Sequence, residues 1–369
     1  MKSTSTAPAA VPQRCASPVA KVRDLAFVRV ARRDLDRAER YYTDFGLTVS
    51  ARNDDALYFR GALAPHHCWI VERGGDEFQG LGFTVGTRED LECLARLPGA
   101  SPVHAGGEPG GGELVTLHDP SGTRVEVVFG MTELPELSVR EPNTYNTPRH
   151  KVRVNRPQPA DQARELVFRL GHAVMHKQEF HRNAQWYCDT LGLIPSDVLL
   201  RPDNHEAVLV FMRCDRGAEP SDHHTVVVAA GISDELEHCA FEVVDPDAVA
   251  GSAQYMRARG WNHTWGVGRH ILGSQIFDYQ RDPSGLLVEH FADGDVLDSS
   301  YPTGYHPLDR AGLYQWGEDM PADFVDVRPT PARIAAIVHG LRDRAEFSLR
   351  RMLAMKKALA VPARPWIKN

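Results

Sequence analysis

An internal repeat limits the fold of this chain more than any other feature of its sequence. In each half, a short apolar run is followed by a helical stretch with a tyrosine near its end. Phe27 lies 15 positions before Tyr42, and His172 lies 15 positions before Tyr187. We therefore expect Phe27 and His172 to occupy equivalent places on equivalent strands of two modules.

Two further pairs of segments follow in the same order. Each half contains a four-residue strand-like segment and later an Asp-Pro-Ser-Gly segment with a glutamate four residues after its glycine. These segments are residues 80–83 and 238–241, then 119–122 before Glu126 and 282–285 before Glu289. Asp-Pro-Ser-Gly favours a turn, and the short β-rich runs around the helices favour an α+β fold.

Composition and charge narrow the class of protein. The chain has 369 residues, 42% of them hydrophobic, and a formal net charge of −7. It has no basic field to attract nucleic acid and no apolar run of the roughly 18 residues that a membrane span needs. Its six cysteines form no close pair, which favours a reducing compartment, so we expect a cytoplasmic protein that binds neither nucleic acid nor membrane.

The repeat and the distribution of proline divide the chain into five parts. We expect a disordered leader, an N-terminal structural module, a proline-containing linker over the surface, a C-terminal catalytic module and an extension with a terminal helix from about residue 332 to 359. Their ranges are 1–20, 21–131, 132–165, 166–295 and 296–369. The terminal helix has an apolar stripe on a basic background, so a docked or intersubunit helix is favoured over a nucleic-acid arm.

The two modules differ at the positions that carry chemistry. His172 and His238 of the second half correspond to Phe27 and Gly80 of the first, whereas Glu289 has a glutamate as its counterpart. Two imidazoles and one carboxylate on one face of a sheet suit non-haem ferrous iron and leave coordination sites open. The first half lacks both imidazoles, and we expect it to bind no metal.

These residues resemble the type I extradiol ring-cleavage dioxygenases of the vicinal oxygen chelate superfamily, which also includes glyoxalases and bleomycin resistance proteins. The resemblance covers roughly residues 22–295. It implies tandem βαβββ modules that form incomplete barrels, with a metal-free N-terminal module and Fe(II) held in the C-terminal one by His172, His238 and Glu289. Mn(II) suits the same ligands. The resemblance also implies a homo-oligomer whose substrates are a catechol and O₂.

The resemblance extends to residues around the metal. The family has an active-site histidine about 15 positions before the second metal histidine, which matches His223, with His224 as the alternative. It has a histidine 19 and a tyrosine 10 positions before the metal glutamate, which match His270 and Tyr279. The resemblance implies that His223 is the acid–base residue and that the other two bind substrate oxygens. Asp278 departs from the apolar residue that many members have there, which weakens any transfer of substrate identity.

The resemblance therefore predicts an Fe(II)-dependent dioxygenase that opens a substituted catechol beside its diol to a muconic semialdehyde-type product. One alternative is a glyoxalase- or isomerase-like enzyme of the same superfamily, which usually has a fourth protein ligand. Another is a metal-free protein that binds a small molecule. For the individual residues, the alternatives are a surface loop at His223 and His224, a turn histidine at His270 and a core tyrosine at Tyr279.

Overall fold

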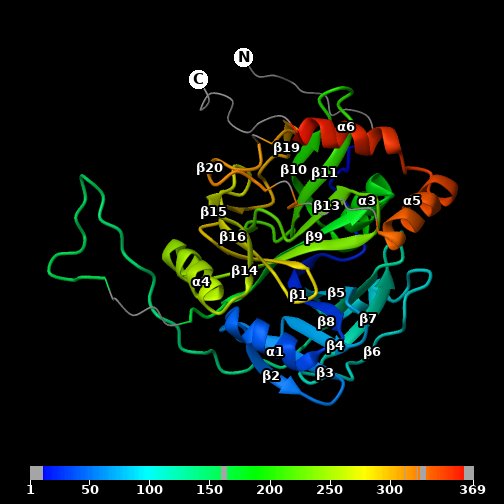
Figure 1. Cartoon of the computed structure of the whole chain (residues 1–369). Helices are drawn as coiled ribbons and strands as arrows, with labels where there is room; N and C mark the ends of the chain where they lie inside the picture. The colour runs from blue at the N-terminus through cyan, green and yellow to red at the C-terminus, as the bar shows by residue number, and fades with distance from the viewer. Residues whose placement is uncertain (1–10, 159–163, 311, 322, 325–329, 361–369) are drawn as a thin grey trace.

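The computed structural model describes residues 11–158, 164–310, 312–321, 323–324 and 330–360, which form two stacked α+β modules (Figure 1). The N-terminal module consists of β1 (Val22–Arg32), α1 (Leu35–Asp44), β2 (Thr48–Arg52), β3 (Ala56–Arg60), β4 (Trp69–Arg73), β5 (Glu77–Val85), α2 (Arg88–Leu94), β6 (His104–Ala105), β7 (Glu113–His118) and β8 (Arg124–Phe129).

The C-terminal module and the extension complete the described elements. The module consists of β9 (Arg169–Lys177), α3 (Phe180–Leu191), β10 (Ile194–Leu200), β11 (Ala207–Arg213), β12 (Ser221–Asp222), β13 (Val226–Ala230), β14 (Glu235–Glu242), α4 (Pro246–Ala258), β15 (Asn262–Arg269), β16 (Ile276–Arg281) and β17 (Leu287–Ala292). The remaining elements are β18 (Val296–Leu297), β19 (Gly304–Pro307), β20 (Trp316–Gly317), α5 (Pro331–Asp343) and α6 (Leu349–Leu359).

The strand order confirms the repeat. The first sheet has the order β2-β3-β4-β1-β5-β8-β7-β6, and the second contains the equivalent order β10-β11-β13-β9-β14-β17-β16-β15. In both sheets the two central strands are antiparallel, and each of them also pairs in parallel with another strand of its module. Each module is therefore two βαβββ units side by side, and within the described residues both sheets stay open, as expected for incomplete barrels. The extension adds β19 and β20 at the edges of the second sheet.

Local sequence signals set the ends of the helices. Asp34 caps α1 by accepting a hydrogen bond from the backbone N–H of Arg37, and Thr87 and Asp90 form a capping box at the start of α2. These contacts satisfy backbone N–H groups that have no partner inside the helix. Gly192 ends α3 in the left-handed conformation (φ 70°), which glycine adopts without steric cost.

The tyrosine and the aspartate that occur in both halves of the repeat form hydrogen bonds between the two modules. Asp282, in the turn before β17, accepts hydrogen bonds from the Tyr42 hydroxyl at 2.7 Å and from Arg32 Nη2 at 2.7 Å, both in the N-terminal module. The three groups are buried, so this ion pair is shielded from water.

In the equivalent contact, the N-terminal module supplies the aspartate and the C-terminal module supplies its partners. Asp119, in the turn before β8 of the N-terminal module, lies 2.6 Å from Lys177 Nζ and accepts a hydrogen bond from the Tyr187 hydroxyl at 3.4 Å, both in the C-terminal module. Each module thus supplies the cation and the hydroxyl for the buried aspartate of the other.

Two expectations about the N- and C-terminal parts of the chain need correction. Residues 11–20 are not a disordered leader, because the backbone N–H groups of Val19 and Ala20 donate to the carbonyls of Asp189 and Thr190 at 3.0 and 3.1 Å. The first residues of the expected leader, 1–10, lie outside the described ones. The expected terminal helix is two helices, α5 and α6, separated at residues 344–348. The end of the extension, residues 361–369, also lies outside the description.

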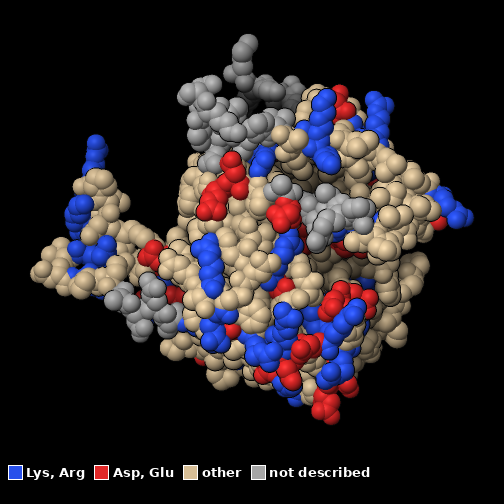
Figure 2. All heavy atoms as spheres, viewed as in Figure 1, with Lys and Arg blue, Asp and Glu red and all other residues tan. Residues whose placement is uncertain are grey.

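The linker is laid over the surface only in its first part. The backbone N–H groups of Leu134 and Leu137 donate to residues of the N-terminal module at 2.7 and 2.8 Å. Arg140 and the backbone N–H of Asn143 then donate to Asp245 of the C-terminal module, each at 2.7 Å. Residues 146–153 project from the body of the molecule (Figure 1), and the Asn146 side chain accepts hydrogen bonds from the backbone N–H groups of Val152 and Arg153 within this segment. Basic side chains gather on this projecting segment (Figure 2).

The free cysteines and the character of the helices agree with what the composition predicted about disulfides and membrane spans. All six cysteines are free, and four of them are buried. In the described part of the chain, no helix has the length and apolar character that crossing a membrane requires.

Replacing Asp282 with alanine tests the contact between the modules. The change leaves Arg32 buried without its carboxylate, which should cost about 3–5 kcal/mol, because a buried charge without its partner is strongly destabilising. We expect a clearly lower urea unfolding midpoint. Asp54→Ala is the control, because Asp54 is exposed, and its midpoint should match that of the unchanged protein. Equal midpoints for the two variants would contradict the assigned role of Asp282.

Candidate metal centre

Three neighbouring strands bring the predicted metal ligands together. His172 lies on β9, His238 on β14 and Glu289 on β17, and these strands are adjacent in the order β9-β14-β17. His172 and Glu289 both pair with Ala240 of β14, so His172, Ala240 and Glu289 lie in one row across the sheet. His238 is two residues before Ala240 and therefore faces the same side. The small Ala240 side chain leaves space between the three larger ones.

The three side chains converge on one point. His172 Nε2 lies 3.5 Å and His238 Nε2 lies 3.4 Å from the same oxygen of Glu289, Oε2. One ligand atom from each residue falls within 4.8 Å of the others. The prediction from the repeat, that residues 66 and 51 positions apart meet in space, agrees with this geometry.

The environment of Glu289 suits a cation. Its side chain is fully buried, and neither carboxylate oxygen has a hydrogen-bond partner among the described residues. Burial alone would raise the pKa of Glu289, but the imidazoles of His172, His238 and His270, whose Nε2 atoms lie 3.5, 3.4 and 3.7 Å from its oxygens, hold this pKa well below its usual value, so the group is an anion. A buried anion without donors is costly, and a metal ion bound by Glu289 and the two histidines would remove that cost. Two imidazoles and one carboxylate suit Fe(II) and also accept Mn(II).

Tyr279 and His270 line one side of the centre. Tyr279 on β16 pairs directly with Glu289, and its hydroxyl lies 3.1 Å from His270 Nε2. His270 Nδ1 donates to the carbonyl of Leu313 at 2.8 Å, so the neutral ring has its lone pair on Nε2, facing Tyr279. Burial, together with the Glu289 carboxylate, raises the pKa of Tyr279 well above its usual value and keeps the phenol protonated.

The structure changes the order of preference between the two adjacent histidines. The ring of His224 lies 4.1 Å from that of His172, measured between centroids, whereas His223 Nε2 lies 2.6 Å from Asp197. His224 is therefore the residue beside the ligands, and His223 lies behind it. Burial lowers the pKa of His224 well below its usual value, as do the nearby rings of His172 and His223, so this imidazole is neutral.

Trp265 and the unusual Asp278 lie on opposite faces of the sheet. Trp265 stacks on Tyr279 with 5.6 Å between ring centroids, on the side of the metal ligands. Asp278, adjacent to Tyr279 on the strand, points to the other side and accepts a hydrogen bond from His263 Nε2 at 2.7 Å. Asp278 and His263 therefore form a buried polar pair away from the site.

Residues of the extension cover one side of the site, and no pattern in the sequence predicted this. Tyr314 and Phe324 pack against Trp265 with ring centroids 5.3 and 5.0 Å away, and Leu313 supplies the carbonyl that orients His270. The extension has no counterpart in the repeat, so the repeat could not place these residues.

In the N-terminal module, other side chains fill the equivalent position. The Phe27 ring lies across Gly82, where an added Cβ would be 2.5 Å from the ring. Glu126, the counterpart of Glu289, lies 3.2 Å from the guanidinium of the buried Arg29 and 2.5 Å from that of Arg124. Arginine thus satisfies the buried carboxylate here, which supports the prediction that this module binds no metal.

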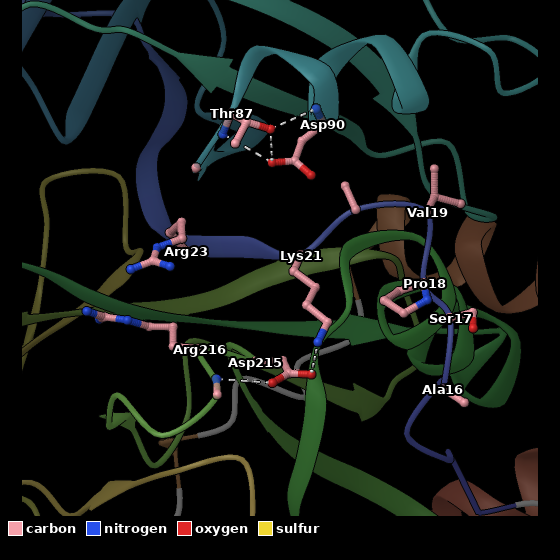
Figure 3. Close-up of a pocket in the computed structure, with 13 residues that line it drawn as sticks. Ala16, Ser17, Pro18, Val19, Lys21, Arg23, Thr87, Asp90, Asp215 and Arg216 are labelled. Carbon is pink, nitrogen blue, oxygen red and sulfur yellow. Dashed lines mark hydrogen bonds and ion pairs between the residues drawn. The ribbon is translucent and has the colours of Figure 1, made fainter.

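A separate hollow of about 580 Å³ lies between the modules and the N-terminal segment (Figure 3). Residues 16–21, the start of α2 and residues 215–217 line it, and Lys21 forms an ion pair with Asp215 across it at 2.8 Å. None of the predicted site residues lines this hollow, so it is not part of the metal centre.

Comparison with known proteins assigns the family. Residues 169–290 match the model of the Glyoxalase/Bleomycin resistance protein/Dioxygenase superfamily. Metapyrocatechase 2 of Cupriavidus necator is 32% identical over 304 residues, which cover 79% of this chain and 88% of that protein. The chain belongs to the extradiol ring-cleaving dioxygenases. This result confirms the resemblance inferred from the sequence and excludes a metal-free binding protein as its family.

More distant relatives agree with the assignment of this dioxygenase. An iron-dependent extradiol dioxygenase of Rhodococcus jostii is 23% identical over 81% of this chain and 97% of that protein. Homoprotocatechuate 2,3-dioxygenase of Brevibacterium fuscum superposes with a TM-score of 0.70 at 19% identity, over 85% of this chain and 84% of that one. A Mn(II)-bound glyoxalase of Novosphingobium aromaticivorans gives a TM-score of 0.69 at 21% identity, over 84% and 96%. At these identities, the two structures establish the shared fold alone.

Matched glutamine variants of the two glutamates test the division between the modules. Glu289→Gln removes the anionic ligand, and we expect bound metal per chain to fall close to zero. Glu126→Gln should keep its metal, because its partners are arginines. Elemental analysis after anaerobic purification measures the metal, and thermal unfolding checks that both variants fold. Equal metal loss in the two variants would show that the modules are not divided in this way.

Proposed function

We propose that this dioxygenase binds Fe(II) through His172, His238 and Glu289 and cleaves a substituted catechol beside its diol with O₂, giving a muconic semialdehyde-type product. The observation that carries the proposal is the convergence of two imidazoles on a buried carboxylate whose oxygens accept no hydrogen bond from the described residues. A ferrous ion there would supply the Lewis acidity and electron exchange that allow triplet O₂ to react with a singlet substrate.

The residues around the ligands are suited to handle the protons of a diol. Tyr279 carries a protonated hydroxyl that can donate to a deprotonated substrate oxygen, and His270 offers Nε2 next to it. His224 is a neutral imidazole on the opposite side, beside His172, and can accept a hydroxyl proton at Nε2. Trp265 and Phe324 exclude water from the tyrosine side.

The number of ligands distinguishes this proposal from a glyoxalase- or isomerase-like reaction. In the described ranges, the only group of three or more histidine, cysteine or acidic side chains whose ligand atoms all lie within 4.8 Å of one another is His172, His238 and Glu289. A fourth protein ligand would occupy a position that a chelating diol and O₂ need.

Two broader features are part of the same proposal. Assembly into a homo-oligomer is supported by apolar side chains that α5 and α6 expose, including Leu341 at 55% and Leu353 at 67% of their surface. A cytoplasmic location stays a prediction, for which six free cysteines are the supporting observation.

Anaerobic purification followed by iron determination and O₂ uptake tests the reaction. We expect bound Fe(II), uptake of one O₂ per catechol consumed with at least one member of a panel of substituted catechols, and a yellow product. A manganese-reconstituted sample shows whether Mn(II) supports turnover. Absence of both iron and O₂ uptake with every diol would falsify the proposal.

Replacing His224 tests the acid–base assignment. His224→Ala should keep iron but lower kcat by about 10²-fold or more, because a positioned acid–base group contributes about 10²–10⁴-fold. His205→Ala is the control, because His205 lies in a turn at the surface, and its kcat should be unchanged. Loss of iron in His224→Ala would instead make this residue a metal ligand.

A further inference from the structure

A buried carboxylate lies behind the two adjacent histidines. Asp197 on β10 accepts a hydrogen bond from His223 Nε2 at 2.6 Å through Oδ2 and one from His306 Nε2 at 2.8 Å through Oδ1. Burial raises the pKa of Asp197, but the hydrogen bonds from His223 and then His306 outweigh burial and lower it, so the carboxyl is ionised. An ionised carboxylate only accepts hydrogen bonds, and His223 must therefore carry its proton on Nε2.

Strand β19 of the extension leaves space for the Asp197 carboxylate beside Gly304. Asp197 pairs with Gly304 of the extension, where β19 joins the edge of the sheet beside β10 (Figure 1). A Cβ on Gly304 would lie 2.0 Å from Asp197 Oδ1, so only glycine leaves room for the side chain. The same strand supplies His306.

A hydrogen bond between the two rings lets His223 determine which nitrogen of His224 carries the proton. The Nδ1 atoms of the two rings are 3.0 Å apart. An imidazole with a single N–H that carries it on Nε2 has a lone pair on Nδ1, and we take His223 in this form. The partner nitrogen, His224 Nδ1, must then donate, and the free lone pair of His224 is on Nε2. That is the nitrogen a base needs to take a proton from a substrate beside His172.

The N-terminal module provides an internal comparison. His66 and His67 occupy the equivalent positions before β4, with their Nδ1 atoms 3.1 Å apart. The counterpart of Asp197 there is Ala51, because Ala51 pairs with Tyr58 as Asp197 pairs with Phe211. Both modules therefore have the histidine pair, but the carboxylate is present only in the module with the metal ligands.

From this geometry we infer that Asp197 and His223 are positioning residues that fix the ring of His224 with its Nδ1–H toward His223 and its Nε2 lone pair toward the substrate. This inference rests on the proposed function of His224. Asp197 touches neither substrate nor metal in this arrangement, and it acts only through the two rings.

Asp197→Ala is the direct test. Without the carboxylate, His223 is free to carry its proton on either nitrogen, and we expect kcat to fall at least about tenfold, as part of the contribution of a positioned acid–base group. Iron per chain should match that of the unchanged enzyme, because His172, His238 and Glu289 are all retained. Asp197→Asn, which retains a carbonyl oxygen as acceptor for His223, should recover part of kcat.

A second measurement needs no turnover. 4-Nitrocatechol bound to the iron-loaded enzyme without O₂ reports its own ionisation, because its visible absorption shifts to longer wavelength when the second hydroxyl loses its proton. We expect the fully ionised spectrum with the unchanged enzyme and a shift toward the singly ionised one with Asp197→Ala.

Matched histidine variants separate orientation from folding. His223→Gln should lower kcat and shift the 4-nitrocatechol spectrum, whereas His66→Gln, the same change in the N-terminal module, should alter neither. Unchanged kcat and spectrum in Asp197→Ala, or loss of iron in that variant, would overturn the inference. If the unchanged enzyme cleaves no catechol, the proposed function fails, and the spectra of bound 4-nitrocatechol still decide whether Asp197 orients His224.

Discussion

The C-terminal module is arranged around a carboxylate that has been removed from water without receiving a hydrogen-bond donor. Glu289 is fully buried, and an ionised carboxylate in that state costs several kcal/mol unless a positive charge meets it. The neighbouring strands supply His172 and His238 rather than arginine or lysine. Imidazoles supply ligand atoms without the fixed charge of arginine or lysine, and the metal ion proposed for this site would supply the positive charge that Glu289 lacks.

The N-terminal module meets the same need with its own side chains. Its sheet has the same strand order and a glutamate at the same place, but Arg29 approaches Glu126, and Phe27 fills the space above Gly82. One backbone thus supports a metal site or an ion pair, and a few side chains decide between them. This contrast explains why the repeat in the sequence was informative: the positions where the two halves differ are the ones that carry chemistry.

The sequence predicted the α+β modules and the convergence of His172, His238 and Glu289 because these residues lie on strands that both halves share. It ranked His223 before His224 on the 15-residue spacing, whereas the backbone before β13 places the ring of His224, not that of His223, beside His172. Asp197 was missed because its partners come from the segment before β13 and from β19, far along the chain. The aromatic cover was missed because the extension has no repeat, and the terminal helix was predicted too long because its apolar spacing continues through residues 344–348.

The exchanged aspartates between the modules have a consequence for how the polypeptide is made. Arg32 leaves the ribosome 250 residues before Asp282, the acceptor that it requires. Asp119 likewise precedes Lys177, so the first half of the nascent chain carries one cation and one anion whose counterparts have not yet been synthesised. The first half cannot complete its interior until translation of the second is nearly finished. An ancestor with a single module would have found the same partners in another copy of itself, and gene duplication would have turned that association into an intramolecular one.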